Sequence, residues 1–435
     1  MILPTFAEIE DFMIDDLVKG IPGGVTPFRL GDIANKGWNI LSEDLPLPVV
    51  VLKASAIDNN ERWMRAFLDA SDAMTSPHGK TTMSPQIFKL LLENGAWAIT
   101  VSTVHHLQVC RRFGFNRILM ANQLVGRQAI RYVLDELRQN DDFEFFCLAD
   151  SLEGVEALRR AVAEEPLGRP INLLLEGGVG GARAGCRDVA TALEVARAIK
   201  TAEPHLVLRG IEGYEGVIYG NVAEDRESQV TRFIDFLVET AEACAHEKLF
   251  SNPPVILSAG GSGYYDIVVD RLAKARLGCE SLVLTRSGGY LFHDSIMYRR
   301  HFERMQERST KIQEIDGGLI PAIQVWSYVQ SCPEPKRVVL SVGKRDISFD
   351  DDLPVAELWY RPGSHDRPQS VCDGCRTVEM HTQHIHMDAP IDHPFRIGDM
   401  IALGISQPCT TFDKWQIIPV IDDDYNVVSA IKTFF

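Results

Sequence analysis

The chain has 435 residues, of which 45% are hydrophobic and 24% are charged, and this composition is that of an ordinary globular protein with one large domain or several smaller ones. Its formal net charge is −16, and no basic run offsets it, so the sequence argues against nucleic acid as a partner. No apolar run approaches the roughly 20 residues that span a bilayer, and the acidic start MILPTFAEIEDFMIDD lacks the pattern of a secretory signal. We therefore expect no membrane association and a cytoplasmic location.

The N-terminal part of the chain, residues 1–55, is expected to be a lead-in followed by one β-strand. Residues 6–18 predict a helix, and the apolar run 48–52 predicts the strand. Because this strand precedes the regular pattern described next, we expect it to join the β domain at the other end of the chain.

Residues 56–315 alternate between strand-length apolar runs and segments with helical spacing. Such alternation is typical of parallel strands joined by right-handed crossovers. Eight runs favour a closed (β/α)₈ TIM-type barrel in the α/β class, and a doubly wound open sheet is the alternative. The predicted strands are 73–76, 97–101, 117–120, 143–148, 171–175, 206–208, 255–257 and 282–284. The predicted helices are 84–93, 104–112, 129–137, 155–163, 189–199, 230–245 and 265–275.

The remaining residues, 316–435, change character. Short β-like runs such as VVLSVGKRD, IGDMIALGIS and WQIIPVID are broken by Pro, Gly and Asp. This pattern predicts a mostly antiparallel β domain, which is discontinuous in sequence if the strand at 48–52 belongs to it.

A lysine follows the first predicted barrel strand, in the segment SPHGKTT. Lysine is costly to bury, so Lys80 at the C-terminal end of a barrel strand indicates a functional role. Its amine can form a Schiff base, and partial burial favours the nucleophilic neutral form. His78, two residues earlier, would point to the same side of an extended strand. A surface lysine is the alternative interpretation.

Two glycine-rich loops follow predicted strands 7 and 8. The first contains Gly260, Gly261 and Ser262, and the second is SGGY, which ends at Tyr290. Consecutive glycines let backbone N–H groups approach a phosphate, and barrels often bind phosphate at these two places. Two ordinary tight turns are the alternative.

The loops after strands 5 and 6 add polar groups at the same rim. EGGVGGARAG contains Arg183, and GYEG contains Tyr214. Both are candidates for cofactor binding because active sites of barrels are built at this rim. A lone tyrosine in such a place can also serve packing alone.

The nine cysteines are scattered and odd in number, which does not indicate a disulfide framework. Cys372 and Cys375 form one CxxC motif. Without a second pair or histidines at ligand spacing, we favour a structural interpretation over a metal site.

Five motifs, in order and spacing, resemble one known family. They are PHGKT, ILMANQLVG, GYEG, LSAGGSG and SGGYLFHD. They look like the D-serine dehydratase / D-threonine aldolase family, whose members are pyridoxal-5′-phosphate (PLP) enzymes of the alanine racemase fold type. The resemblance runs from about residue 48 to the C-terminus and includes the lead-in VVVLKASAIDNN.

The resemblance implies roles for several residues. Lys80 would be the Schiff-base lysine and, once freed by the substrate amine, the base that removes the Cα proton, with His78 beside it. Lys53 is the rival lysine, but it lies in the pre-barrel strand, where the family has no catalytic lysine. Tyr214 would lie near the pyridine nitrogen. Gly260, Gly261 and Ser262 would hold the phosphate, with Tyr290 nearby.

The resemblance also implies a divalent metal, zinc or manganese, near the C-terminus. The segment ISQPCT matches a family motif that reads His-x-Cys or His-x-Asp, so Cys409 is present but Gln407 replaces the histidine. An amide oxygen is a poor zinc ligand. Gln407 therefore weakens the site, His384 of the family-like Gln-His pair helps, or no metal binds.

The sequence thus favours a PLP-dependent lyase acting on a small D-3-hydroxy amino acid, with D-serine dehydration to a 2-oxo acid and ammonia as the simplest reaction. D-Threonine aldolase-type cleavage of Cα–Cβ, racemisation, and a PLP-binding protein with weak or no lyase activity are the alternatives. The family resemblance also implies a homodimer.

Overall fold

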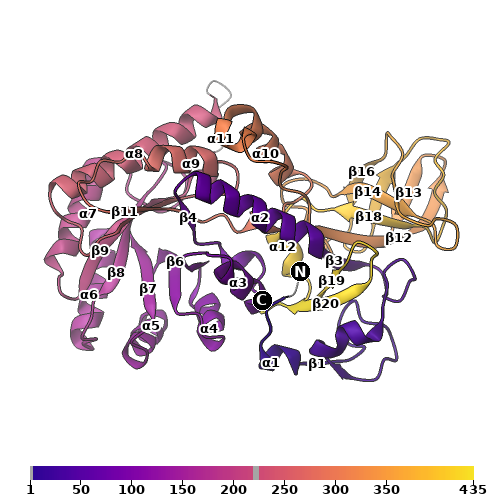
Figure 1. The fold of residues 1–435 in the computed structure, drawn as a ribbon, viewed down its shortest axis with the longest axis horizontal. Helices are drawn as coiled ribbons and strands as arrows, with labels where there is room; N and C mark the ends of the chain where they lie inside the picture. The colour runs from indigo at the N-terminus through magenta and orange to yellow at the C-terminus, as the bar shows by residue number, and fades with distance from the viewer. Residues whose placement is uncertain (1–2, 219–224) are drawn as a thin grey trace.

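The computed structural model describes residues 3–218 and 225–435 (Figure 1). The N-terminal segment forms a short helix α1 (Ala7–Glu10), a two-stranded pair of β1 (Met13–Ile14) with β2 (Phe28–Arg29), and a 3₁₀ segment η1 (Leu30–Lys36). The predicted helix over 6–18 is therefore wrong beyond residue 10. Asp15 and Asp16 explain the difference, because their carboxylates accept the backbone N–H groups of Leu17 and Gly24 and so compete with helical hydrogen bonds.

Eight parallel strands and the helices that connect them form the larger part of the described chain. Their order is β4-β11-β10-β9-β8-β7-β6-β5. Two backbone hydrogen bonds join the edge at β4 to the edge at β5: the Trp97 N–H donates to the Thr75 carbonyl at 2.8 Å, and the Thr100 N–H donates to the Pro77 carbonyl at 2.9 Å. The predicted barrel is thus confirmed, and an open sheet is excluded. The strands are β4 (Met74–Thr75), β5 (Ile99–Val101), β6 (Arg117–Gln123), β7 (Glu144–Ala149), β8 (Ile171–Gly177), β9 (Leu206–Gly213), β10 (Val255–Ala259) and β11 (Ser281–Thr285).

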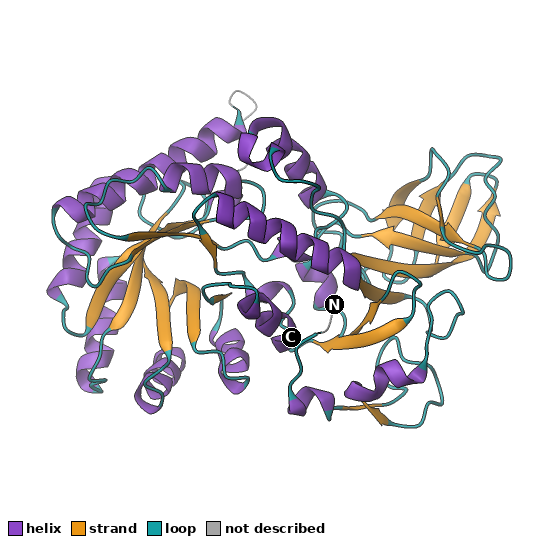
Figure 2. Cartoon of the chain, viewed as in Figure 1, coloured by secondary structure: helices purple, strands orange, loops and turns teal. Residues whose placement is uncertain are grey.

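Helices cover the outer face of this barrel (Figure 2), and apolar side chains fill its interior. Strands that are buried on both faces consist of continuous apolar runs, which is why they can be recognised in the sequence. The interior cluster consists of Leu119, Phe146, Leu148, Leu174, Ile256 and Leu284. The helices are α2 (Ala54–Ala70), α3 (Pro85–Glu93), α4 (Val104–Arg112), α5 (Arg127–Gln139), α6 (Leu152–Glu164), α7 (Val189–Thr201), α8 (Arg226–His246), α9 (Tyr265–Leu272), α10 (Met297–Arg308) and α11 (Thr310–Gln313).

The C-terminal part is a mostly antiparallel β domain. The strand before the barrel, β3 (Val49–Lys53), lies in its sheet, antiparallel to β12 and parallel to β19. The chain therefore enters this domain before it builds the barrel. The other strands are β12 (Ile323–Glu334), β13 (Arg337–Leu340), β14 (Val355–Tyr360), β15 (Gln369–Ser370), β16 (Arg376–Met380), β17 (Ile385–Asp388), β18 (Met400–Gly404), β19 (Ile417–Ile421) and β20 (Val427–Lys432).

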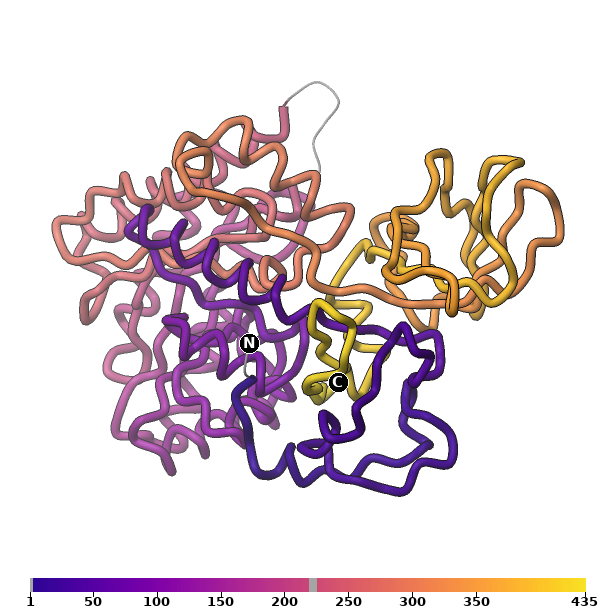
Figure 3. The backbone as a smooth tube through the Cα atoms, turned by 45° about the vertical axis from the view of Figure 1, so that its right-hand side comes forward, coloured from indigo at the N-terminus to yellow at the C-terminus, as the bar shows by residue number. Residues whose placement is uncertain are grey.

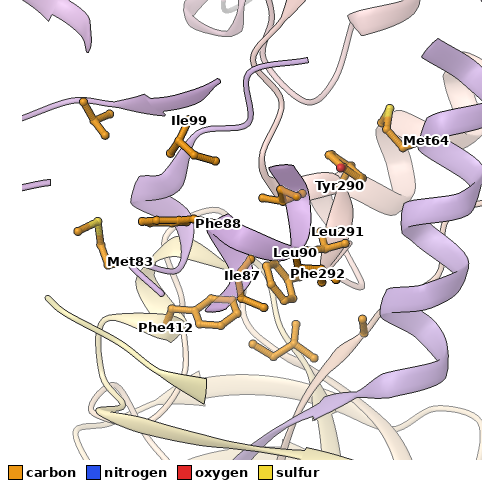
Figure 4. Packing of buried hydrophobic residues seen from close by; sticks show 14 of the residues in the cluster. Met64, Met83, Ile87, Phe88, Leu90, Ile99, Tyr290, Leu291, Phe292 and Phe412 are labelled. Carbon is orange, nitrogen blue, oxygen red and sulfur yellow. The ribbon is translucent and has the colours of Figure 1, made fainter. Parts of the chain in front are cut away.

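The two parts pack against each other beside the first barrel strand (Figures 1 and 3). A short helix of the β domain, α12 (Cys409–Phe412), ends in a buried ring that meets Phe292 with a centroid distance of 4.7 Å. Figure 4 shows Phe412 beside Ile87 of α3. This packing brings the start of α12, and with it Cys409, to the segment that contains Lys80.

None of the helices within the described ranges combines the length and the apolar character that a bilayer span requires.

Candidate active site

Lys80 lies in a single 3₁₀ turn, η2 (Gly79–Thr81), at the C-terminal rim of the barrel. A Cβ at Gly79 would stand 2.9 Å from the Phe88 ring and 3.1 Å from Ile99, so only glycine fits below the turn. The sequence predicted that His78 and Lys80 point to the same side of an extended strand. This prediction is wrong, because the strand ends at Thr75. Instead, His78 Nδ1 accepts the Lys80 backbone N–H in a long contact of 3.4 Å.

The surroundings of Lys80 favour its neutral amine. The side chain is half-buried, and burial lowers its pKa, with further lowering from the positive charges of Arg183 and Arg286, while Cys409 acts in the opposite direction. Burial raises the pKa of the Cys409 thiol, against the effects of Thr81 and Lys80. The thiol donates to Thr81 Oγ1 at 3.7 Å. Burial at the rim thus shifts both groups toward their neutral forms, the amine of Lys80 and the thiol of Cys409.

The two glycine-rich loops meet each other and reach Lys80. Because Ala259 pairs with Thr285 at the ends of β10 and β11, both loops begin at the same level. Ser287 Oγ donates to Ser262 Oγ at 3.1 Å, and the Tyr298 hydroxyl donates to the same Ser262 oxygen. A Cβ at Gly288 would stand 2.7 Å from the His78 backbone N and O atoms. The glycine therefore lets the second loop lie directly on the Lys80 segment.

Gly260 and Gly261 shape the first loop. Gly260 has φ +136°, which side-chain-bearing residues rarely adopt. The Gly261 N–H donates to Glu215 Oε1 at 2.6 Å, and burial raises the pKa of Glu215. The loop is thus anchored on a buried carboxyl group, and the hydroxyl groups of Ser287 and Tyr298 converge on Ser262.

An arginine that sequence reasoning missed lies beneath these loops. Arg286 follows β11, is 6% exposed, and forms an ion pair of 2.5 Å with the buried Glu212 on β9. It also donates to the Gly213 carbonyl at 2.6 Å. Burial raises the pKa of Glu212 to about 8. The position of Arg286 directly after strand 8 was a signal in the sequence, whereas nothing in the sequence singles out Glu212 or Tyr298.

Tyr214 and Arg183 lie together at the same rim. Tyr214 is half-buried and Arg183 is exposed, and the guanidinium carbon of Arg183 stands 5.1 Å from the centre of the Tyr214 ring. A Cβ at Gly216 would stand 2.5 Å from the Tyr214 hydroxyl, and one at Gly261 would stand 3.1 Å from Tyr214 Cε2. Tyr214 therefore lies against the first glycine-rich loop, and Arg183 covers the ring from the solvent side.

Tyr290 is directed away from the two loops. It belongs to the 3₁₀ turn η4 (Gly289–Leu291), and its hydroxyl donates to Glu61 Oε2 of α2 at 2.9 Å. Figure 4 shows Tyr290 beside Met64 of the same helix. The aromatic hydroxyl at Ser262 is that of Tyr298 instead.

We expect Tyr298→Phe, but not Tyr290→Phe, to weaken the affinity of the site for phosphate-bearing ligands by about tenfold, because one hydrogen bond to a charged group contributes about 1.5 kcal/mol. Titration of purified protein with PLP, followed by fluorescence, measures both affinities. Tyr290→Phe should lower the free energy of unfolding instead, since it leaves Glu61 without its donor. Equal losses of affinity in the two variants would contradict this assignment.

The residues expected to bind a metal do not form a ligand set. Gln407 Oε1 accepts the Cys409 N–H at 3.1 Å, so the amide caps α12. His384 lies in the turn between β16 and β17, where its carbonyl accepts the His381 N–H at 2.8 Å. Among residues 3–218 and 225–435, no group of three His, Cys, Asp or Glu ligand atoms includes Cys409. Zinc requires such donors, so these residues do not fit it.

Cys372 and Cys375 are free thiols in the described structure, with their sulfur atoms 3.3 Å apart. No histidine or carboxylate group within the described ranges joins them in a set of three ligands.

Taken together, the fold and the rim define a parallel β/α barrel protein with a half-buried lysine facing two glycine-rich loops, and with an appended antiparallel β domain. Residues 52–279 match the family described as "Alanine racemase, N-terminal domain". Because this match covers more than half of the chain, the protein belongs to that family. Residues 322–421 match the "Putative serine dehydratase domain". The predicted family resemblance is thus confirmed.

Solved structures share the fold. The D-threonine aldolase from Filomicrobium marinum superimposes with a TM-score of 0.73 at 18% identity, covering 91% of this chain and 97% of that one. The D-threo-3-hydroxyaspartate dehydratase from Delftia sp. HT23 gives 0.68 at 18% identity, with 91% and 99% covered. The alanine racemase from Clostridium difficile 630 gives 0.55 at 12% identity, with 89% and 99% covered. No curated protein sequence matches this chain significantly.

Proposed function

We propose that this protein is a PLP-dependent lyase of D-3-hydroxy amino acids, and that it converts D-serine to a 2-oxo acid and ammonia. The observation that carries the proposal is the half-buried Lys80 amine beside two glycine-rich loops whose serines, Ser262 and Ser287, are hydrogen-bonded to each other. The D-threonine aldolase and the D-threo-3-hydroxyaspartate dehydratase with the same fold support the substrate class by their names.

The residues of the rim fit PLP. The amine of Lys80 suits the aldehyde, and the hydroxyl groups that meet at Ser262 suit the phosphate. The Gly261 N–H donates to Glu215 in this structure, so it would have to exchange this partner for a phosphate oxygen. A Cβ at Gly289 would overlap the Tyr298 hydroxyl, so the glycine leaves the space that this hydroxyl needs to reach Ser262. When bound, PLP supplies an electron sink that stabilises negative charge at the substrate Cα.

The chain's own groups then handle the protons. Lys80 Nζ, with its pKa lowered by burial, accepts the proton from Cα. Cys409 Sγ, whose pKa burial raises, keeps its proton and is our candidate for the acid that protonates the departing 3-hydroxyl group. Tyr214 and Arg183, which lie together beside the first glycine-rich loop, would help to hold the cofactor.

A divalent metal, zinc or manganese, was expected by family resemblance. The Gln407 side-chain oxygen accepts the Cys409 N–H at the start of α12, and the Gln407 backbone N–H donates to Ser348 Oγ at 3.0 Å. Since these donors do not fit zinc, no step of the proposed reaction passes through a metal at the barrel rim.

Cleavage of Cα–Cβ, as in a D-threonine aldolase, is the second candidate. His78 favours it, because burial and the nearby positive charges of Lys80 and Arg286 lower the pKa of its imidazole well below the usual value. A neutral imidazole beside Lys80 can accept the proton of the substrate 3-hydroxyl group.

The test is product analysis with PLP-loaded protein. We expect pyruvate from D-serine, at a rate that EDTA, zinc and manganese leave unchanged, and we expect Gln407→His to make the rate depend on added metal because imidazole and thiolate then face one ion. Glycine and acetaldehyde from D-threonine, without pyruvate from D-serine, would favour the aldolase. If both the wild type and Gln407→His bind PLP but release neither product, the lyase proposal fails and a PLP-binding protein remains.

A further inference from the structure

The hairpin formed by β16 and β17 has one buried and one outward face. Met380, Ile385 and Met387 point into the core. Alternation along the strands therefore turns Glu379 and His386 outward, and these two residues are cross-strand partners. His381 follows Glu379 by two residues, and its N–H donates to the His384 carbonyl to close the turn. Two histidines and a glutamate are thus gathered on one face of the β domain.

Their ligand atoms are close enough to share one ion. His381 Nε2 lies 3.3 Å from Glu379 Oε1, and His386 Nδ1 lies 3.1 Å from Glu379 Oε2. One ligand atom from each of the three side chains can be chosen so that all lie within 4.8 Å of one another. Ligands about 2.1 Å from a tetrahedral ion are separated by about 3.4 Å, so each histidine nitrogen already lies at about this distance from one oxygen of the Glu379 carboxylate.

Arg337 lies beside this cluster and competes with a metal ion for His386. Arg337 Nη1 stands 3.3 Å from His386 Nδ1, and Arg337 Nε forms an ion pair of 3.1 Å with Asp388. The His386 Nδ1 atom therefore faces a carboxylate oxygen and a guanidinium group at once, and a single proton on this nitrogen cannot satisfy both. A metal ion bound to His386 Nδ1 would take the place of the Arg337 guanidinium group at this nitrogen.

We propose that Glu379, His381 and His386 form a zinc-binding site on this hairpin. Imidazole and carboxylate groups are ligands that zinc prefers, and the exposed side of the cluster, where the Glu379 and His381 side chains are 55% and 50% exposed, admits water as the fourth ligand. Arg337 turns away from His386 when zinc binds and keeps its ion pair with Asp388. The site is separate from the barrel rim and does not depend on the proposed lyase activity.

Calorimetric titration of the full-length protein with Zn²⁺ alone tests the site. We expect one equivalent whose affinity falls by on the order of tenfold or more in His381→Ala, His386→Ala and Glu379→Gln. His246→Ala is the matched control, since it removes an exposed histidine from the barrel. Cys372→Ser and Cys409→Ser should retain the equivalent, because no thiolate takes part. The complex with Co²⁺ should accordingly lack a thiolate charge-transfer band.

Arg337→Gln keeps the proposal falsifiable if a ligand variant folds poorly. Because it removes the competing cation, we expect this variant to bind Zn²⁺ several-fold more tightly than the wild type. Unchanged zinc affinity in Glu379→Gln, or loss of the equivalent only in a cysteine variant, would overturn the proposal. Weaker binding in Arg337→Gln would overturn it as well. Pyruvate formation from D-serine, measured separately in the Glu379, His381, His386 and Arg337 variants, should stay at the wild-type rate, because none of these residues lies at the barrel rim.

Discussion

Lys80→Ala is expected to abolish the absorbance of lysine-bound PLP near about 420 nm and to lower kcat/KM for D-serine by at least about 10³-fold. The variant loses both the amine that binds the cofactor covalently and the base that accepts the Cα proton. Absorbance spectra of the purified protein and a coupled pyruvate assay measure the two effects independently.

Lys53→Ala is the matched control for this experiment. Lys53 is also half-buried, also ends a β-strand, and its pKa is also lowered by burial. It differs from Lys80 in location, because its strand belongs to the β domain. It also differs in its neighbours, because the negative charges of Glu357 and Asp423 raise its pKa. We expect the absorbance to persist in Lys53→Ala. Its loss there, with retention in Lys80→Ala, would show that the other lysine binds the cofactor.

Arg286→Met is expected to lower the free energy of unfolding by about 3 kcal/mol at pH 7, because the Gly213 carbonyl and Glu212 both lose a charged donor in a buried place. Denaturant unfolding followed by circular dichroism measures the change. The effect should exceed that of surface arginine variants such as Arg131→Met, which lies in an exposed pair of 3.9 Å.

The pH dependence of the Arg286→Met effect identifies its cause. Burial raises the pKa of Glu212 to about 8 in the folded protein, and Arg286 opposes this rise. Both proteins therefore lose stability together as the pH rises from about 4.5 to about 8, since the folded state keeps a proton that the unfolded state releases. Above about pH 8 only the variant continues to lose stability, by about 1.4 kcal/mol per pH unit. Arg286→Met/Glu212→Gln should remove this widening difference, and its persistence would contradict the explanation.

The barrel could be predicted because its strands are buried on both faces. Segments such as Ile171–Gly177 then read as apolar runs of strand length, and the helices between them show their own period. Lys80 and the glycine-rich loops could be predicted for a related reason. The C-terminal ends of parallel strands meet at one rim, so residues that follow different strands are brought together whatever their separation in sequence.

Side-chain directions in the turns could not be predicted in this way. The turn η4 directs Tyr290 toward Glu61, and the hydroxyl at Ser262 comes from Tyr298 on the next helix. The Gln407 side-chain oxygen likewise accepts the Cys409 backbone N–H instead of lying beside the Cys409 thiol as a metal ligand. In each case the direction of the side chain is set within a turn, and no period in the sequence records it.

The amino-acid sequence by itself determined the alternation of strands and helices, the family, and the lysine at the barrel rim, because each depends on local spacing and residue type. The tertiary structure alone decided which groups meet that lysine, which carboxyl group Arg286 meets, and that Glu379, His381 and His386 share one face. Those outcomes depend on packing between segments distant in sequence, where the direction of a single turn determines whether two side chains touch.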